Sequence, residues 1–85
     1  MGEGEGTSPE GTTLESAVRI DSPDEMTGVR AEYAWLEGRY PGYQIRVQRL
    51  VRGPGGGFYD LIRFAMPDGT EHEIYFDIRA FFGRR

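Results

Sequence analysis

The chain has 85 residues and a mass of 9.6 kDa, which suits one small domain with a single core. It contains no cysteine, so disulfides, thiolate metal ligands and thiol nucleophiles are excluded. No apolar run approaches the roughly 20 residues that span a bilayer, and no signal-peptide pattern follows Met1. These features predict a cytoplasmic protein that has no membrane partner.

Charge is distributed unevenly along the chain. Residues 1–25 contain seven acidic side chains and one arginine, a net charge of −6, whereas residues 26–85 have a net charge of +2. The overall charge of −4 therefore describes the N-terminal segment and does not exclude nucleic-acid binding. All ten basic residues are arginine and asparagine is absent, a bias that predicts a GC-rich, bacterial genome.

Residues 1–21 are predicted to form a disordered acidic tail rich in glycine and glutamate. The first 13 residues have no large apolar side chain after Met1, so burial cannot offset the backbone entropy lost on ordering, about 1–2 kcal/mol per residue. Residues 14–20 suit either a short strand or a docked arm. A single α+β domain is predicted over residues 22–85.

A helix is predicted to begin at Pro23 and to end at Pro41-Gly42. Ser22 suits the N-cap position, and Glu25 three residues later suits a capping box. Apolar residues then recur at steps of three and four, as on one side of a helix. This stripe comprises Met26, Val29, Tyr33, Leu36 and Tyr40. Ala31 and Trp35 lie beside the stripe, and Arg30, Glu32, Glu37 and Arg39 fall mostly off it.

Beyond residue 42 the apolar period changes to two, which is typical of β-strands. A first strand is predicted over residues 43–52, with a bulge near Gln48-Arg49 because Leu50 breaks the alternation. Two more strands flank residues 67–69, which suit a three-residue hairpin loop with Gly69 in the left-handed conformation.

This loop fixes the register of the hairpin. One face pairs Met66 with Thr70, Phe64 with His72, Ile62 with Ile74 and Asp60 with Phe76. The other face pairs Arg63 with Glu73, Leu61 with Tyr75 and Tyr59 with Asp77. The predicted fold is α+β: an N-terminal helix packed on a three-stranded antiparallel β-meander, in the order α-β-β-β, followed by a short C-terminal helical turn.

No residue set in the sequence satisfies the needs of catalysis, so no enzyme activity, cofactor or metal is predicted. His72 lies on the opposite strand face from Glu71 and Glu73, which makes a poor zinc site. The glycines at 53–57 lack the Gly-Lys-Ser/Thr of a phosphate-binding loop. A small enzyme that uses Asp60, His72 or Asp77 is the weakest of three functional hypotheses.

The leading hypothesis is a non-catalytic interaction domain. One helix covers one sheet face, yet the other face presents Tyr59, Leu61 and Tyr75 as neighbours. This face is covered by Phe81 and Phe82, by residues 14–20, or by another chain. Where the cover is partial, the remaining patch would bind a protein partner or a second copy of the chain.

The alternative hypothesis is nucleic-acid binding. Arginines on the predicted strands and at the C-terminus could form a basic stripe with tyrosines between them, as in proteins that combine electrostatic attraction with base stacking. These arginines are Arg46, Arg49, Arg52, Arg63, Arg84 and Arg85. The acidic tail would then compete with the nucleic acid for this stripe.

Overall fold

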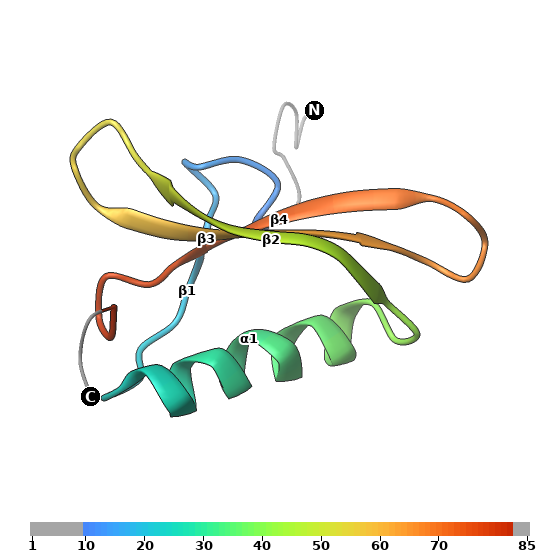
Figure 1. The fold of residues 1–85 in the computed structure, drawn as a ribbon, viewed down its shortest axis with the longest axis horizontal. Helices are drawn as coiled ribbons and strands as arrows, with labels where there is room; N and C mark the ends of the chain where they lie inside the picture. The colour runs from blue at the N-terminus through green and yellow to red at the C-terminus, as the bar shows by residue number, and fades with distance from the viewer. Residues whose placement is uncertain (1–9, 83–85) are drawn as a thin grey trace, which may run out of the picture.

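The structure is a computed structural model that describes residues 10–82. Its elements are β1 (Val18–Arg19), α1 (Glu25–Arg39), β2 (Gln44–Arg52), β3 (Phe58–Ala65) and β4 (Glu71–Asp77). The four strands form one twisted sheet, and α1 lies along one of its faces (Figure 1). The α+β class predicted from the sequence is therefore confirmed.

Within residues 10–82, the sheet has four strands in the order β1-β4-β3-β2, one more than predicted. β1 pairs in parallel with β4, with Val18 opposite Phe76, so the sheet is mixed and is not a purely antiparallel meander. Val18 and Ile20 are buried in the core. β1 lies within residues 14–20, the part of the predicted 1–21 tail that suited a short strand. Residues 1–9 of that tail lie outside the described residues.

The β3–β4 hairpin has the predicted register at every pair from Tyr59–Asp77 to Phe64–His72. Beyond the ladder, the Met66 amide donates to the carbonyl of Thr70 at 2.8 Å. Gly69 has a φ of 89°, the left-handed conformation that this loop requires. Because an antiparallel pair fixes the face of every side chain, this hairpin determines which residues meet α1.

β2 has its bulge at Arg46, so the predicted position at Gln48-Arg49 is wrong. Ile45 lies opposite Phe64 on the helix side, whereas Val47 lies on the other face of the sheet. The bulge shifts the alternation by one residue, and Leu50 therefore follows the alternation that begins after Arg46.

The N-cap of helix α1 lies two residues later than predicted. Asp24, not Ser22, is the N-cap: its carboxylate accepts hydrogen bonds from the amide and the hydroxyl of Thr27, at 3.0 and 3.1 Å. These hydrogen bonds hold the pKa of Asp24 below its ordinary value. A carboxylate at this position also interacts favourably with the helix dipole, which an uncharged serine does not.

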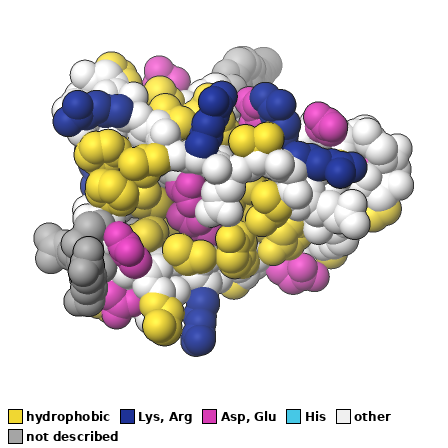
Figure 2. Space-filling model, viewed as in Figure 1, with side chains coloured by type: hydrophobic (Ala, Val, Ile, Leu, Met, Phe, Trp, Pro, Cys, Tyr) yellow, Lys and Arg dark blue, Asp and Glu magenta, His cyan; other side chains and the backbone are white. Residues whose placement is uncertain are grey.

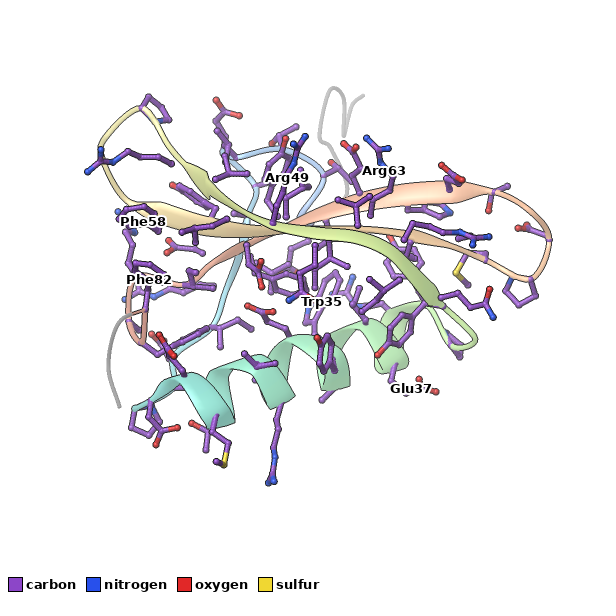
Figure 3. The ribbon with its side chains drawn as sticks, in the orientation of Figure 1. Trp35, Glu37, Arg49, Phe58, Arg63 and Phe82 are labelled. Atoms are coloured by element: carbon purple, nitrogen blue, oxygen red, sulfur yellow. The ribbon has the colours of Figure 1, made fainter. Side chains whose placement is uncertain are left out.

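The buried line of α1 differs from the predicted apolar stripe. It comprises Gly28, Glu32 and Leu36, spaced four residues apart. Met26, placed in the stripe by the sequence, is 68% exposed. Trp35 lies between α1 and the sheet, with its ring 5.5 Å from that of Phe76 (Figure 3). The core comprises Val18, Ile20, Leu36, Ile62, Phe64, Ile74, Phe76, Ile78 and Phe81.

The C-terminal segment forms a single hydrogen-bonded turn, which does not quite match the predicted short helical turn. The amides of Phe81 and Phe82 both donate to the carbonyl of Ile78, at 3.1 and 2.8 Å. Phe81 is buried in the core beside α1, and the ring of Phe82 lies 4.6 Å from that of Phe58. In the described part of the chain, no helix has the length and apolar character that crossing a membrane requires.

Candidate functional site

The face of the sheet away from α1, here called the outer face, contains Tyr59, Leu61 and Tyr75. Leu61 is buried, and the two tyrosines are half-buried. At the free edge of β4, the carbonyl of Gly11 accepts a hydrogen bond of 2.7 Å from the Tyr75 amide, and Glu10 pairs with Arg39 of α1. The residues that follow Gly11 loop out on the side of the sheet away from α1 (Figure 1). This segment overlaps the docked arm considered from the sequence, whereas Phe81 and Phe82 lie on the helix side.

The structure does not bring the arginines into one stripe. Arg49 and Arg63 both point away from α1 on the outer face (Figure 3), but Arg63 is paired with Glu73 through hydrogen bonds of 2.8 and 3.0 Å. Arg52 lies over the ring of Phe58, 5.2 Å from its centroid. Arg46 is the bulge residue of β2, and Arg84 and Arg85 lie outside the described residues.

β2 is an outer strand of the sheet, with β3 as its only neighbour among the strands of the described residues. Eight of its nine residues are exposed, including the apolar Ile45, Val47 and Leu50. The strand also carries three arginines and no acidic residue. One edge of β2 therefore offers free backbone donors and acceptors beside a basic, partly apolar surface.

A second feature, absent from the sequence-based predictions, is a pocket of about 180 Å³ between α1, the sheet and the C-terminal turn. Its apolar lining comes from Val29, Leu50, Ile78, Phe81 and Phe82. Its acidic lining comes from Glu25, Glu32 and Asp60. We call this cavity the carboxyl pocket. Figure 2 shows acidic side chains bordered by hydrophobic ones in this region between α1 and the sheet.

Glu32 is the unusual residue of this pocket. Its side chain is 0% exposed, and neither carboxyl oxygen has a hydrogen-bond donor in the described structure. Burial raises the pKa of Glu32 to about 9, and the adjacent Asp60 carboxylate acts in the same direction by its charge and as an acceptor for the proton of Glu32. At neutral pH Glu32 is therefore an uncharged acid next to an acceptor.

Asp60 is held in place by a chain of hydrogen bonds. Its Oδ2 accepts a hydrogen bond of 3.0 Å from the amide of Gln48, whose oxygen accepts one of 3.0 Å from the hydroxyl of Tyr33. The chain links β3 to β2 and then to α1. Gln48 engages Oδ2 of Asp60, and no hydrogen bond is formed by Oδ1 in the described structure.

No family model, curated protein or solved structure matched this chain. The functional argument therefore depends on the residues and their geometry. In residues 10–82, no three histidine, cysteine, aspartate or glutamate side chains are arranged to hold a metal ion.

The other predicted candidates for chemistry do not meet in one place. His72 stacks on Phe64, with ring centroids 5.6 Å apart, and its Nε2 lies 3.2 Å from the hydroxyl of Thr70. Asp77 forms a 2.6 Å ion pair with Arg79, which holds the pKa of Asp77 below its ordinary value. Asp60 lies on the helix side of the sheet and Asp77 on the outer face, as the register predicted.

Sequence reasoning missed Glu32 because the helical stripe was centred on Met26, Val29 and Tyr33. The signal that could have identified it is the spacing from Gly28 through Glu32 to Leu36, which places a glutamate on the same line as a glycine and a leucine. Carboxylates are seldom fully buried, so the spacing alone gave little reason to predict a buried glutamate.

Proposed function

We propose that this chain is a non-catalytic binding domain that takes up an extended, acidic polypeptide segment along β2. The observation that carries the proposal is the exposure of β2: an outer strand of nine residues, eight of them exposed. An added strand would satisfy the free backbone groups of β2, which is the usual way in which proteins capture extended peptides.

The charge of β2 supports an acidic partner over a second copy of the chain. Arg46, Arg49 and Arg52 occur within seven residues, and β2 has no compensating carboxylate. Two copies of β2 side by side would bring six arginines together, which opposes self-association. A segment with glutamate or aspartate would be attracted by the same arginines, and electrostatic attraction of this kind also speeds association.

The outer face has a smaller role in partner binding here than in the hypothesis drawn from the sequence. Leu61 has little exposed surface to offer a partner, because it is 7% exposed. Tyr59 and Tyr75 remain partly exposed, and Tyr59 lies opposite Val51 of β2. A strand added at the free edge of β2 would place side chains beside Val47, Arg49 and Val51, with β2 between the partner and these tyrosines.

A fluorescent peptide in which glutamate alternates with valine would test the proposal by fluorescence anisotropy. We expect it to bind more tightly than the same peptide with arginine in place of glutamate. Methylation of alternate backbone amides should abolish binding, because it removes the donors that would pair with β2. Equal binding of the methylated peptide would contradict strand addition.

Charge reversal provides the matched control. Arg49→Glu should weaken peptide binding by about tenfold, whereas Arg30→Glu, which changes an exposed arginine of α1, should leave it unchanged. Two results would overturn the proposal: tighter binding of a single-stranded oligonucleotide than of the acidic peptide, which would favour the nucleic-acid hypothesis, or sedimentation of the chain as a dimer that Arg49→Glu dissociates.

A further inference from the structure

The carboxyl pocket holds a buried acid that the fold leaves unsatisfied. Glu32 has no donor within hydrogen-bond distance although it is fully enclosed, and such a group ordinarily destabilises a protein. Asp60 can accept the proton of Glu32, but it is itself an acid and supplies neither a donor nor a positive charge. The pair is thus complementary to a group that brings several donors and a positive charge.

We propose that the carboxyl pocket binds a primary alkylammonium group, with Asp60 and Glu32 as its charged ligands. The ammonium would donate to the oxygen of Asp60 that Gln48 leaves open and to the carboxyl of Glu32. Three N–H donors on one small cation suit two carboxyl groups that lie close together. This proposal is independent of peptide binding along β2.

The walls of the pocket define the rest of the ligand. The apolar lining of the cavity comes from Val29, Leu50, Ile78, Phe81 and Phe82, so the group behind the ammonium is apolar. A volume of about 180 Å³ is roughly six times the volume of a water molecule in the liquid, which suits a short unbranched alkyl chain. Such a group is present in free alkylamines and in lysine side chains.

Binding of the cation would release a proton from the pocket. The other titratable groups that line the pocket are Asp60 from β3 and Glu25 from α1; β2 contributes Leu50, and the C-terminal turn contributes apolar side chains. In the free protein, Glu32 is neutral at neutral pH because burial and Asp60 raise its pKa. An ammonium beside it favours the carboxylate, so the bound cation replaces the proton.

Titration of the full chain with n-butylammonium tests the proposal, and n-butanol is the neutral ligand of matched shape. We expect saturable binding of butylammonium, monitored by changes in NMR chemical shift at α1, β3 and the C-terminal turn. Butanol should bind at least tenfold more weakly. In weakly buffered solution with a pH indicator, about one proton should be released per cation bound. Equal binding of butanol, or binding without proton release, would overturn the proposal.

Two variants locate the ligands. Asp60→Asn should weaken butylammonium binding at least tenfold, and Glu32→Gln should weaken it and abolish proton release. Glu37→Gln, which changes an exposed glutamate of the same helix, should affect neither. Proton release by the unmodified chain tests the proposal even where Asp60→Asn fails to fold.

Nα-acetyl-lysine methylamide distinguishes the two sources of the ammonium group. Binding as tight as that of butylammonium identifies a lysine side chain as the ligand, and weaker binding identifies a free amine.

Discussion

The ring of Phe81 lies against the backbone of α1 at Gly28, so closely that a Cβ atom at Gly28 would come within 2.5 Å of Cε2 of that ring. Gly28 is the first residue of the buried line of α1, and Phe81 is the last residue of the core. The contact joins the C-terminal turn to the start of the helix. It also explains why a glycine occurs in the first half of a helix, where it lowers helix stability by about 1 kcal/mol relative to alanine.

We expect Gly28→Ala to lower the free energy of unfolding by about 1 kcal/mol or more. Overpacking against an aromatic ring costs about 1–3 kcal/mol and outweighs the gain in helix propensity. Gly38→Ala is the control, since a Cβ atom at this helical glycine meets nothing within 4 Å, and it should raise stability by up to about 1 kcal/mol. Urea denaturation measures both, and equal effects of the two variants would contradict the role of Phe81.

A second prediction concerns the pH dependence of stability. Glutamate has an ordinary pKa of 4.5, and burial raises the pKa of Glu32 to about 9. Between these values the folded chain binds more protons than the unfolded chain, so the contribution of Glu32 decreases as the pH rises, by about 1.4 kcal/mol per pH unit. The decrease begins near pH 4.5, where the unfolded chain loses this proton, and ends near pH 9, where the folded chain loses it.

Glu32→Gln should therefore stabilise the protein at alkaline pH and flatten its stability between pH 5 and 9. The amide imitates the neutral acid and cannot ionise. Glu37→Gln should leave the slope of the unmodified chain in place, because Glu37 is exposed. Chemical denaturation across this range provides the measurement, and parallel curves for Glu32→Gln and the unmodified chain would show that Glu32 does not titrate in this window.

The parts of the fold that sequence reasoning predicted correctly are those that local geometry determines. The register of β3 and β4 follows from a three-residue loop and the alternation on either side of it. β1 could not be established in the same way, because two residues pair with a strand more than 50 positions away. The position of the bulge in β2 is likewise set by its partner strand and not by its own pattern.

The candidate sites depend still more on tertiary contacts. β2 and its arginines were identified from the sequence, but its exposure follows from its position at the end of the strand order. The carboxyl pocket needs α1 turned so that Glu32 faces Asp60, and that rotation places Gly28 against Phe81. No periodicity within α1 contains this information, since the partners come from β3 and the C-terminal turn.

A third prediction separates the two residues that could cap α1. Asp24→Ala should lower the midpoint of thermal unfolding by about 5 °C, because the amide and hydroxyl of Thr27 lose their acceptor. Ser22→Ala, at the position favoured by the sequence, should leave the midpoint unchanged within about 1 °C. The hydrogen bonds that lower the pKa of Asp24 require its carboxylate, so the difference between the variants should disappear as the pH falls through that lowered pKa. An equal loss in Ser22→Ala would assign the cap to Ser22.

The last prediction concerns the loop on which the hairpin register depends. Gly69 has a φ of 89°, and its missing Cβ atom would meet no other group within 4 Å. Gly69→Ala should therefore destabilise the protein through backbone strain alone, by about 1–2 kcal/mol. Gly55→Ala, in the β2–β3 loop, also has open space around it but no positive φ, and it should be neutral or slightly stabilising. Urea denaturation compares the two; a loss of stability in Gly55→Ala equal to that in Gly69→Ala would show that the conformation of Gly69 does not set the hairpin.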